Sequence, residues 1–300
     1  MTTTDKKFKL VQIYFYICNR FEIELKYVCE RFSNNHEPEF TDQEVITIYL
    51  YVMHLESRFR VKHIYEFACE YLRDWFPKLP SYEAFTTRIN RLCEVFRVLS
   101  ETILAEFIPE DCNQDISLID SMPVITCSAK RKAKVALEIT DKGYCSTKSI
   151  YYYGCKLNAI GFYHKKHLPH PEQLILAKAS VNDITFLKSI ASIIEDRTFF
   201  GDKIYGHAEY WNQMEKTNNC TMFTPIKDIK GEAEVLRQRD YAYNKLFSKA
   251  VSAIREPIES LFNWLIEKTD IQKASKVRST KGLLTYVFGR ISAAYIFLIF

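Results

Sequence analysis

The chain has 300 residues, of which 47% are apolar and 26% are charged, and its formal net charge is +4. This length allows one large domain or two ordinary ones. With 8 Gly and 9 Pro, the composition excludes collagen-like and low-complexity chains, and the apolar content excludes a mostly disordered one. Residues 121–170 hold nine Lys or Arg against two Asp or Glu. Such a basic block indicates either a polyanion-binding surface or a solvated face.

Cysteine usage and the two ends of the chain predict a cytoplasmic protein. The nine cysteines include no Cys-x-x-Cys pair, and residues 1–9 are too polar for a signal peptide, so reduced thiols are expected. After Arg290 only ten uncharged residues remain, which is too short a segment to span a bilayer. The tail therefore suits a buried helix, and no membrane partner is expected.

In chain order, residues 8 to about 108 read as helical. Helices are predicted over 8–32, from a capping box at Thr41 and Glu44 to residue 55, and over 61–76. Two prolines then break the chain, and Ser81 can cap a further helix over 82–107, either continuous or interrupted. This corner is compatible with a helix-turn-helix in which Arg88 and Arg91 contact DNA bases. An ordinary helical corner that binds no DNA is the alternative.

The pattern changes near residue 115, where β-branched and apolar runs begin. Strands are predicted over 116–126, 150–162, 173–181, 198–205 and 220–226. A helix over 183–194 separates the third strand from the fourth, and helices follow over 232–268 and from 281 onward. The short connections between the first three strands predict antiparallel pairing, with a crossover helix leading to the fourth strand.

Two carboxylates stand out because they interrupt apolar strands. Asp120 lies within a Leu-Ile-Asp-Ser-Met-Pro-Val run, and Asp202 follows Phe-Phe-Gly. A carboxylate at such a position is costly unless it is paired or metal-bound. For either one taken alone, a salt bridge or a cap is the favoured interpretation.

Five segments carry a resemblance to the bacterial DDE insertion-sequence transposases. They are 118–124 (Leu-Ile-Asp-Ser-Met-Pro-Val), 152–158 (Tyr-Tyr-Gly-Cys-Lys-Leu-Asn), 179–183 (Ala-Ser-Val-Asn-Asp), 200–205 (Phe-Gly-Asp-Lys-Ile-Tyr) and 255–262 (Arg-Glu-Pro-Ile-Glu-Ser-Leu-Phe). They occur in the order found in that family, and the resemblance is greatest to insertion-sequence family 982. It extends from about residue 40 to the end of the chain.

The resemblance implies a fold, a reaction and a set of partners. Residues 1–110 would form an all-helical DNA-binding domain. Residues 111–300 would form an RNase H-like mixed-sheet catalytic domain with a helical tail. The implied activity is cleavage of DNA at transposon ends and transfer of the 3′-OH to target DNA, with two Mg²⁺ or Mn²⁺ ions as cofactors. The implied partners are the terminal inverted repeats, target DNA and further copies of the chain, as a homodimer or higher oligomer.

Asp120, Asp202 and Glu259 are the predicted catalytic and metal-binding residues. Glu256 is the competitor for the third position. On a helical wheel Glu259 lies at the margin of the face made by Ile258 and Phe262, whereas Glu256 lies further toward solvent. Pro257 either starts a new helix or kinks a longer one, and if the helix continues, Arg255 sits one turn before Glu259.

Several basic residues are predicted to contact DNA besides Arg88 and Arg91. They are Lys130, Arg131, Lys132, Lys134, Lys156, Lys203 and Arg255. The related Tyr-x2-Arg-x3-Glu-x6-Lys signature is incomplete, because Ser252 and Ile266 stand where it has Tyr and Lys. Any DNA-positioning role that the Tyr and Lys of the signature carry is therefore in doubt for this chain.

One histidine cluster and two alternative functions complete the predictions. His164, His167 and His170 could form a zinc site, although a solvated or phosphate-facing loop is favoured over it. One alternative is a different RNase H-like nuclease or an inactive relative. The other is a helix-turn-helix regulator, in which the three acids would be scattered.

Overall fold

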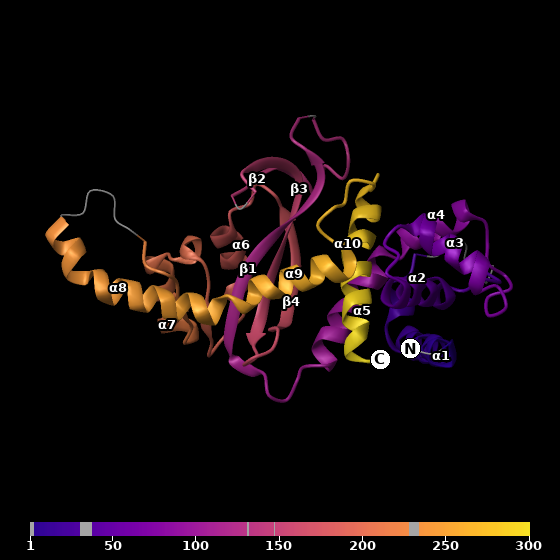
Figure 1. The fold of residues 1–300 in the computed structure, drawn as a ribbon, viewed down its shortest axis with the longest axis horizontal. Helices are drawn as coiled ribbons and strands as arrows, with labels where there is room; N and C mark the ends of the chain where they lie inside the picture. Colours follow the sequence, from indigo (N-terminus) through magenta and orange to yellow (C-terminus); the bar gives the residue numbers. More distant parts are fainter. Residues whose placement is uncertain (1–2, 31–37, 131, 147, 228–233) are drawn as a thin grey trace. The chain divides into compact units, whose positions relative to one another are not determined.

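In the computed structural model, helices form the first third of the chain and a mixed sheet follows (Figure 1). The structure describes residues 3–30, 38–130, 132–146, 148–227 and 234–300. They group into two units. The helical unit comprises the described residues up to Phe107 together with Ala133–Glu138 and Leu265–Phe300. The sheet unit comprises the described residues of Ile108–Lys132 and Ile139–Trp264.

The helical unit confirms the predicted N-terminal helices with shorter bounds. Its helices are α1 (Thr3–Ile23), α2 (Asp42–Glu56), α3 (Val61–Tyr71), α4 (Tyr82–Arg91) and α5 (Cys93–Glu106), with a 3₁₀ turn, η1 (Leu25–Tyr27). The capping box at the start of α2 is present, because the Thr41 and Glu44 side chains each bond the other residue's backbone N–H. Ser81 caps α4 as predicted, and Leu92 separates α4 from α5 within the helix predicted over 82–107.

The C-terminal tail is the buried helix α10 (Thr280–Tyr295), followed by η3 (Ile296–Leu298). α10 packs against α5 and α2, and Ser292 donates a hydrogen bond to the Phe96 carbonyl. Arg290 is buried, stacks on the Tyr286 ring at 3.9 Å, and donates to the Thr269 carbonyl and, at 2.6 Å, to the Phe59 carbonyl. Among the described residues, no helix combines the length and apolar character needed to cross a membrane.

The sheet unit contains one six-stranded mixed sheet. Its strands are β1 (Asn113–Ser128), β2 (Asp141–Cys145), β3 (Ile150–Tyr163), β4 (His170–Lys178), β5 (Thr198–Phe200) and β6 (Thr221–Phe223). The order is β2-β3-β1-β5-β6, and β4 also pairs with β3. β3 is antiparallel to β1, β2 and β4, whereas β5 and β6 run parallel to β1. This is the predicted RNase H-like pattern.

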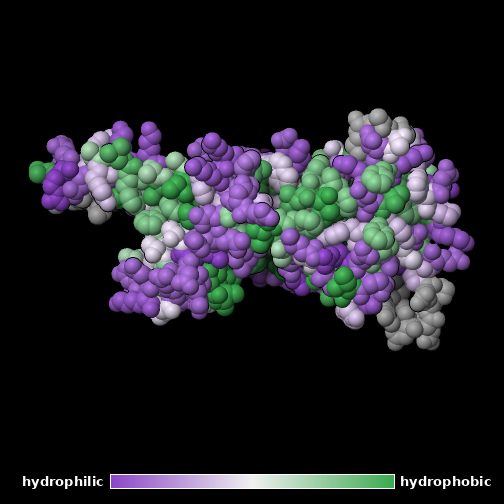
Figure 2. Space-filling model, turned by 90° about the horizontal axis from the view of Figure 1, so that it is seen from below, coloured by the Kyte–Doolittle hydropathy of each residue, from purple (hydrophilic) through white to green (hydrophobic). Residues whose placement is uncertain are grey.

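Four helices flank this sheet: α6 (Asp183–Ala191), α7 (Ala208–Asn218), α8 (Glu234–Arg255) and the start of α9 (Pro257–Thr269). α6 and α7 bury Leu187 and Trp211 in a core with Ile119 and Phe199 of the sheet. α8 contacts β1 and β5, and α8 and α9 follow one another across the strands in Figure 1. Apolar side chains of α8, such as Leu246, are exposed and alternate with hydrophilic ones in Figure 2.

Several elements and boundaries of the sheet unit differ from the prediction. β2 and α7 were not predicted, and the fourth predicted strand ends at Phe200, after which Lys203–Tyr205 form a 3₁₀ turn, η2. α7 begins at Ala208 after the N-cap residue His207, whose Nδ1 accepts the Tyr210 backbone N–H at 3.3 Å. The helical region predicted over 232–268 is two helices, and Pro257 is the first residue of the second, which was one of the two expectations for it.

Candidate active site

The register of the sheet brings Asp120 and Asp202 to one edge. β1 and β5 run parallel, and Leu118 pairs with Phe200. Two residues further along each strand are Asp120 and Asp202, so the two acids leave the paired region side by side. β5 ends there, and only β3 continues to pair with β1, through Ala159 opposite Asp120. A crevice beyond the carboxyl ends of parallel strands is where such sheets commonly place a site.

Strand alternation then decides which helices each side chain of β1 can reach. Ile119 packs in the core beneath α6 and α7, so its neighbour Asp120 faces the opposite side of the sheet. There the Oδ2 atom of Asp120 lies 3.2 Å from Nη1 of Arg255, the last residue of α8. The other nitrogen of the same guanidinium donates to Oε1 of Glu259 in α9. One arginine therefore joins two of the three predicted acids.

The pKa of Asp120 responds to Asp202 as well as to Glu259. Burial raises the pKa of Asp120 to about 6. The backbone N–H of Ser121 and the Arg255 guanidinium lower this pKa, whereas the negative charges of Glu259 and Asp202 raise it. Both other acids thus act on Asp120, as expected when carboxylates share a site.

Glu259 and Glu256 differ in what surrounds them. Ile258 and Leu265 are fully buried, and Glu259 lies beside this apolar face, in the first turn of α9. Its carboxylate is half exposed and pairs with Arg255, four residues earlier. Glu256 is exposed at the junction of α8 and α9, where its backbone carbonyl accepts the Glu259 N–H at 3.0 Å. Both glutamates are exposed, and Glu259 is the one that Arg255 links to Asp120.

Among the described residues, the partner of the Asp202 carboxylate is a backbone N–H rather than a basic side chain. Its Oδ1 accepts the Lys203 backbone N–H at 2.6 Å, where it caps the 3₁₀ turn η2. The preceding Gly201 packs on the buried Tyr205 ring so closely that a Cβ there would lie 2.8 Å from a ring carbon. Glycine at 201 therefore lets the chain turn tightly and keeps Asp202 at the end of β5.

The sequence matches the family described as Transposase DDE domain over residues 111–292. This chain belongs to the Transposase DDE domain family. The match spans more than half of the chain and includes all three predicted acids, and it indicates transposase activity. Comparisons with curated proteins and with solved structures gave no significant match.

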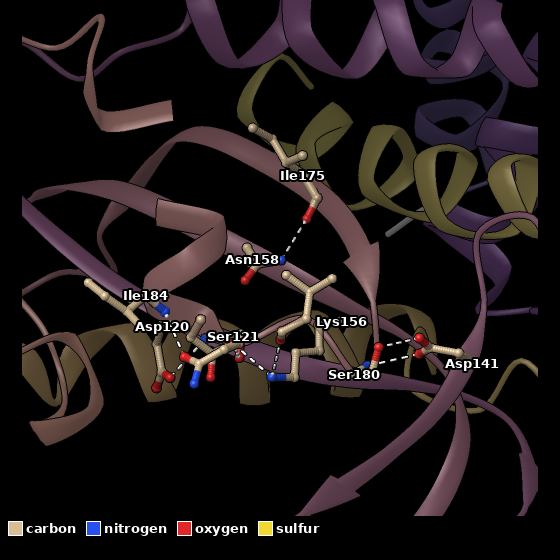
Figure 3. A network of polar contacts seen from close by, with 11 residues as sticks. Asp120, Ser121, Asp141, Lys156, Asn158, Ile175, Ser180 and Ile184 are labelled. Atoms are coloured by element: carbon tan, nitrogen blue, oxygen red, sulfur yellow. Dashed lines mark hydrogen bonds and ion pairs between the residues drawn. The ribbon is translucent and has the colours of Figure 1, made fainter. Parts of the chain in front are cut away.

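On the opposite face of this transposase domain, a polar network fixes the strand that carries Asp120 (Figure 3). Ser121 donates from Oγ to Oδ1 of Asp183, at the start of α6, over 3.0 Å. Lys156 of β3 donates to the same oxygen at 3.0 Å and to the Val181 carbonyl at 3.0 Å. Lys156 was predicted to contact DNA, and here its charge is balanced by Asp183.

The remaining basic candidates fall into three groups. Lys203 is exposed directly after Asp202, and Lys130, Lys132 and Lys134 are exposed after β1. Arg131 lies outside the described residues. These positions leave the predicted DNA contacts of the exposed lysines as predictions.

Arg88 does not suit the role predicted for it. Its side chain is buried, and its Nε atom lies 2.6 Å from Oδ1 of Asp42, at the start of α2. It also donates to the Phe40 carbonyl. These contacts hold the guanidinium in the helical core, which counts against the predicted contact of Arg88 with DNA bases. Arg91 is only partly buried and stays a prediction.

A hollow lined by β2, β3 and the turn before α6 was missed from the sequence. Its lining includes Lys142, Tyr144, Tyr151, Lys156 and Ile204. The rings of Tyr144 and Tyr151 lie 4.9 Å apart and are about half exposed, and Lys142 lies 4.9 Å from the Tyr151 ring. Exposed aromatic rings next to a lysine are suited to stacking on nucleic-acid bases. The tyrosine run at 151–153 was the available signal, but only the pairing with β2 assembles the surface.

Proposed function

We propose that this transposase domain cleaves DNA at the ends of an insertion sequence and joins the freed 3′-OH to target DNA. The observation that supports this most is the arrangement of three carboxylates from β1, the end of β5 and α9. Asp120 and Asp202 occupy matching positions on parallel strands, and Arg255 links Asp120 to Glu259. A regulator that only binds DNA would have no need of such a cluster.

The donor set fits divalent ions such as Mg²⁺ or Mn²⁺. All three side chains offer carboxylate oxygens, which hard cations prefer, and they come from separate segments. The pKa of Asp120 is raised partly by the charges of the other two acids, a repulsion that a bound cation would relieve. Two such ions, when bound, activate the attacking oxygen and stabilise the leaving oxygen of an in-line displacement.

The residues of the chain have separate tasks in this proposal. Asp120, Asp202 and Glu259 hold the ions. Arg255 keeps Asp120 and Glu259 together, and its forked donors match the geometry of phosphate oxygens. In cleavage, water forms a new P–O bond as the P–O3′ bond at the transposon end breaks, which leaves a free 3′-OH. In joining, this 3′-OH forms a new P–O bond to a target phosphate as the P–O3′ bond of the target strand breaks, which leaves a 3′-OH on the target.

DNA is the proposed partner, held on the exposed basic residues of the sheet unit. Lys203 and the lysines at 130 and 132 supply charge near β1 and β5. The Tyr144 and Tyr151 rings add a stacking surface. Arg91, the last residue of α4 within residues 1–110, is proposed to recognise terminal repeats. We also propose membership of insertion-sequence family 982, on the five motifs, and action as a dimer or higher oligomer on paired ends.

The test is cleavage of a labelled duplex that carries the DNA flanking the gene, with Mg²⁺ or with chelator. Wild-type protein should nick this duplex only with metal. Asp202→Asn should lower the rate by about 100-fold or more, as loss of a charge-stabilising group does, while DNA binding persists. Asp196→Asn, an exposed acid elsewhere in the sheet unit, is the control and should cut normally.

Two other results would change the assignment. Metal-dependent cutting of any duplex, without joining to a target, would identify a different RNase H-like nuclease. Specific binding without cutting by the wild-type protein would identify an inactive relative.

A further inference from the structure

Away from the three acids, a second group of ligand-type side chains meets where β3 turns into β4. Asp111 precedes β1, and His164 and His167 lie in the β3–β4 turn. The ligand atoms of these three residues all lie within 4.8 Å of one another. Asp111 and Asp120 are separated by most of the first half of β1, so this group belongs to a different part of the sheet unit.

The backbone of the turn brings the two histidines together. The His167 N–H donates to the His164 carbonyl at 3.2 Å, and Lys166 has a left-handed φ of 67°. The two imidazole rings consequently lie 4.5 Å apart with an interplanar angle of 36°. Such a turn orients two nitrogen ligands toward the same volume without any contribution from a helix or strand.

The contact between His164 and Asp111 is unusual for a simple ion pair. Nε2 of His164 lies 2.9 Å from Oδ1 of Asp111. The same nitrogen is shielded from solvent, yet within the described part of the chain no acceptor stands in hydrogen-bonding geometry to it. A buried polar atom without a partner is costly. A nitrogen and an oxygen that are close but not aligned for a hydrogen bond are placed as two ligands of one ion would be.

We propose that Asp111, His164 and His167 bind a transition-metal ion of the Zn²⁺ type. Two imidazoles and one carboxylate form a donor set used for Zn²⁺, with a fourth position open to water. This ion is distinct from the hard cations proposed for the carboxylate cluster, because imidazole nitrogen favours Zn²⁺ over Mg²⁺. The proposal does not rest on the proposed transposase reaction.

The bound ion would have a structural consequence. Asn113 pairs with Tyr163, but the register shifts between that pair and the next, Ser117 with Phe162. The β1–β3 ladder is therefore irregular at this end. A metal joining the segment before β1 to the β3–β4 turn would fasten the irregular end, and it would stabilise the folded chain by mass action.

The experiment is a Zn²⁺ titration of the full chain after chelator treatment, by calorimetry in excess Mg²⁺, with Co²⁺ as a spectroscopic probe in parallel. We expect one equivalent of Zn²⁺ to bind, visible d–d bands with Co²⁺, and a higher melting temperature. His167→Ala and Asp111→Asn should each weaken binding by at least the roughly 10- to 100-fold that loss of even an outer-shell partner costs. Both side chains are exposed, so these variants should fold.

Three comparisons complete the test. His63→Ala, in α3, should bind Zn²⁺ like the wild type, and His167→Cys, which restores a ligand, should recover binding. Asp202→Asn should also retain binding, which separates this site from the carboxylate cluster. Equal Zn²⁺ binding by the wild type and His167→Ala would overturn the proposal, as would loss of binding in Asp202→Asn alone.

Discussion

At the scale of single residues, Asp120 occupies a site that disfavours its charge. Its pKa is raised from 3.8 to about 6, mainly by burial. Below pH 4 the carboxyl is protonated in the folded and unfolded states alike, so it costs no stability. Between pH 4 and pH 6 the unfolded chain loses this proton while the folded chain still retains it. The folded state therefore loses stability over the interval from pH 4 to pH 6.

Asp120→Asn should consequently stabilise the metal-free protein at neutral pH. A shift of two pKa units corresponds to about 2–3 kcal/mol in the free energy of unfolding. Urea unfolding of both proteins in chelator, from pH 4 to pH 8, measures this difference. The curves should converge near pH 4, separate between pH 4 and pH 6, and keep a constant separation above pH 6. A variant less stable than the wild type at pH 7 would contradict this description of the site.

At the level of single residues, the sequence pointed to candidates where the pattern that marks them is local. Asp120 and Asp202 could be found because a carboxylate inside an apolar strand is conspicuous. Their alignment depended on the pairing of Leu118 with Phe200, which no local pattern reveals. The burial of Arg88 had a local signal, since it shares a helical face with Phe85 and Leu92. Its partner Asp42 lies 46 residues away and could not be inferred.

At the scale of elements, Arg88 joins α4 to the start of α2. Arg88→Ala would leave the Asp42 carboxylate and the Phe40 carbonyl without this donor. Breaking a buried pair costs about 3–5 kcal/mol, and somewhat less is expected here because Asp42 is partly exposed. Thermal unfolding should show the loss. Arg91→Ala is the matched control and should destabilise less. Equal stability of both variants would mean that the Arg88 pair is not structural.

The β2–β3 surface yields a prediction about DNA. Tyr144→Ala and Tyr151→Ala should each weaken binding of single-stranded transposon-end DNA by about tenfold, because stacking contributes roughly 1–3 kcal/mol per base. Tyr241→Ala removes an exposed ring from α8 and serves as control. Fluorescence anisotropy measures all three affinities. If Tyr241→Ala weakens binding as much as the other two, the hollow has no special role.

The elements missed from the sequence share a physical cause. β2 is a five-residue strand, Asp-Lys-Gly-Tyr-Cys, without apolar alternation. It forms because β3 offers an edge from Ile150 to Gly154, and because Asp141 accepts the Ser180 backbone N–H at 2.8 Å. α7 is largely polar and is fixed by burial of Trp211 and Met214. β2 forms by pairing that its own residues do not signal, and α7 is fixed by a core assembled from distant strands, whereas the capping box and the β-branched strands are marked by local sequence.

At the scale of the whole molecule, the chain alternates between its two units. It enters the sheet unit at Ile108, contributes Ala133–Glu138 to the helical unit, and returns to that unit at Leu265. The predicted helical tail, α10, packs among the N-terminal helices because its buried face includes Leu283, Val287 and Ile291. The family match at 111–292 therefore includes segments from both units.

The central claim is that Asp120, Asp202 and Glu259 act together on DNA, and the neighbouring glutamates test it most directly. Glu259→Gln and Glu256→Gln make the same chemical change three residues apart, at the start of α9. Metal-dependent cleavage of the transposon-end duplex should fall by about 100-fold or more in Glu259→Gln, while Glu256→Gln keeps the wild-type rate. Wild-type cleavage by Glu259→Gln, or its loss in Glu256→Gln alone, would contradict the assignment.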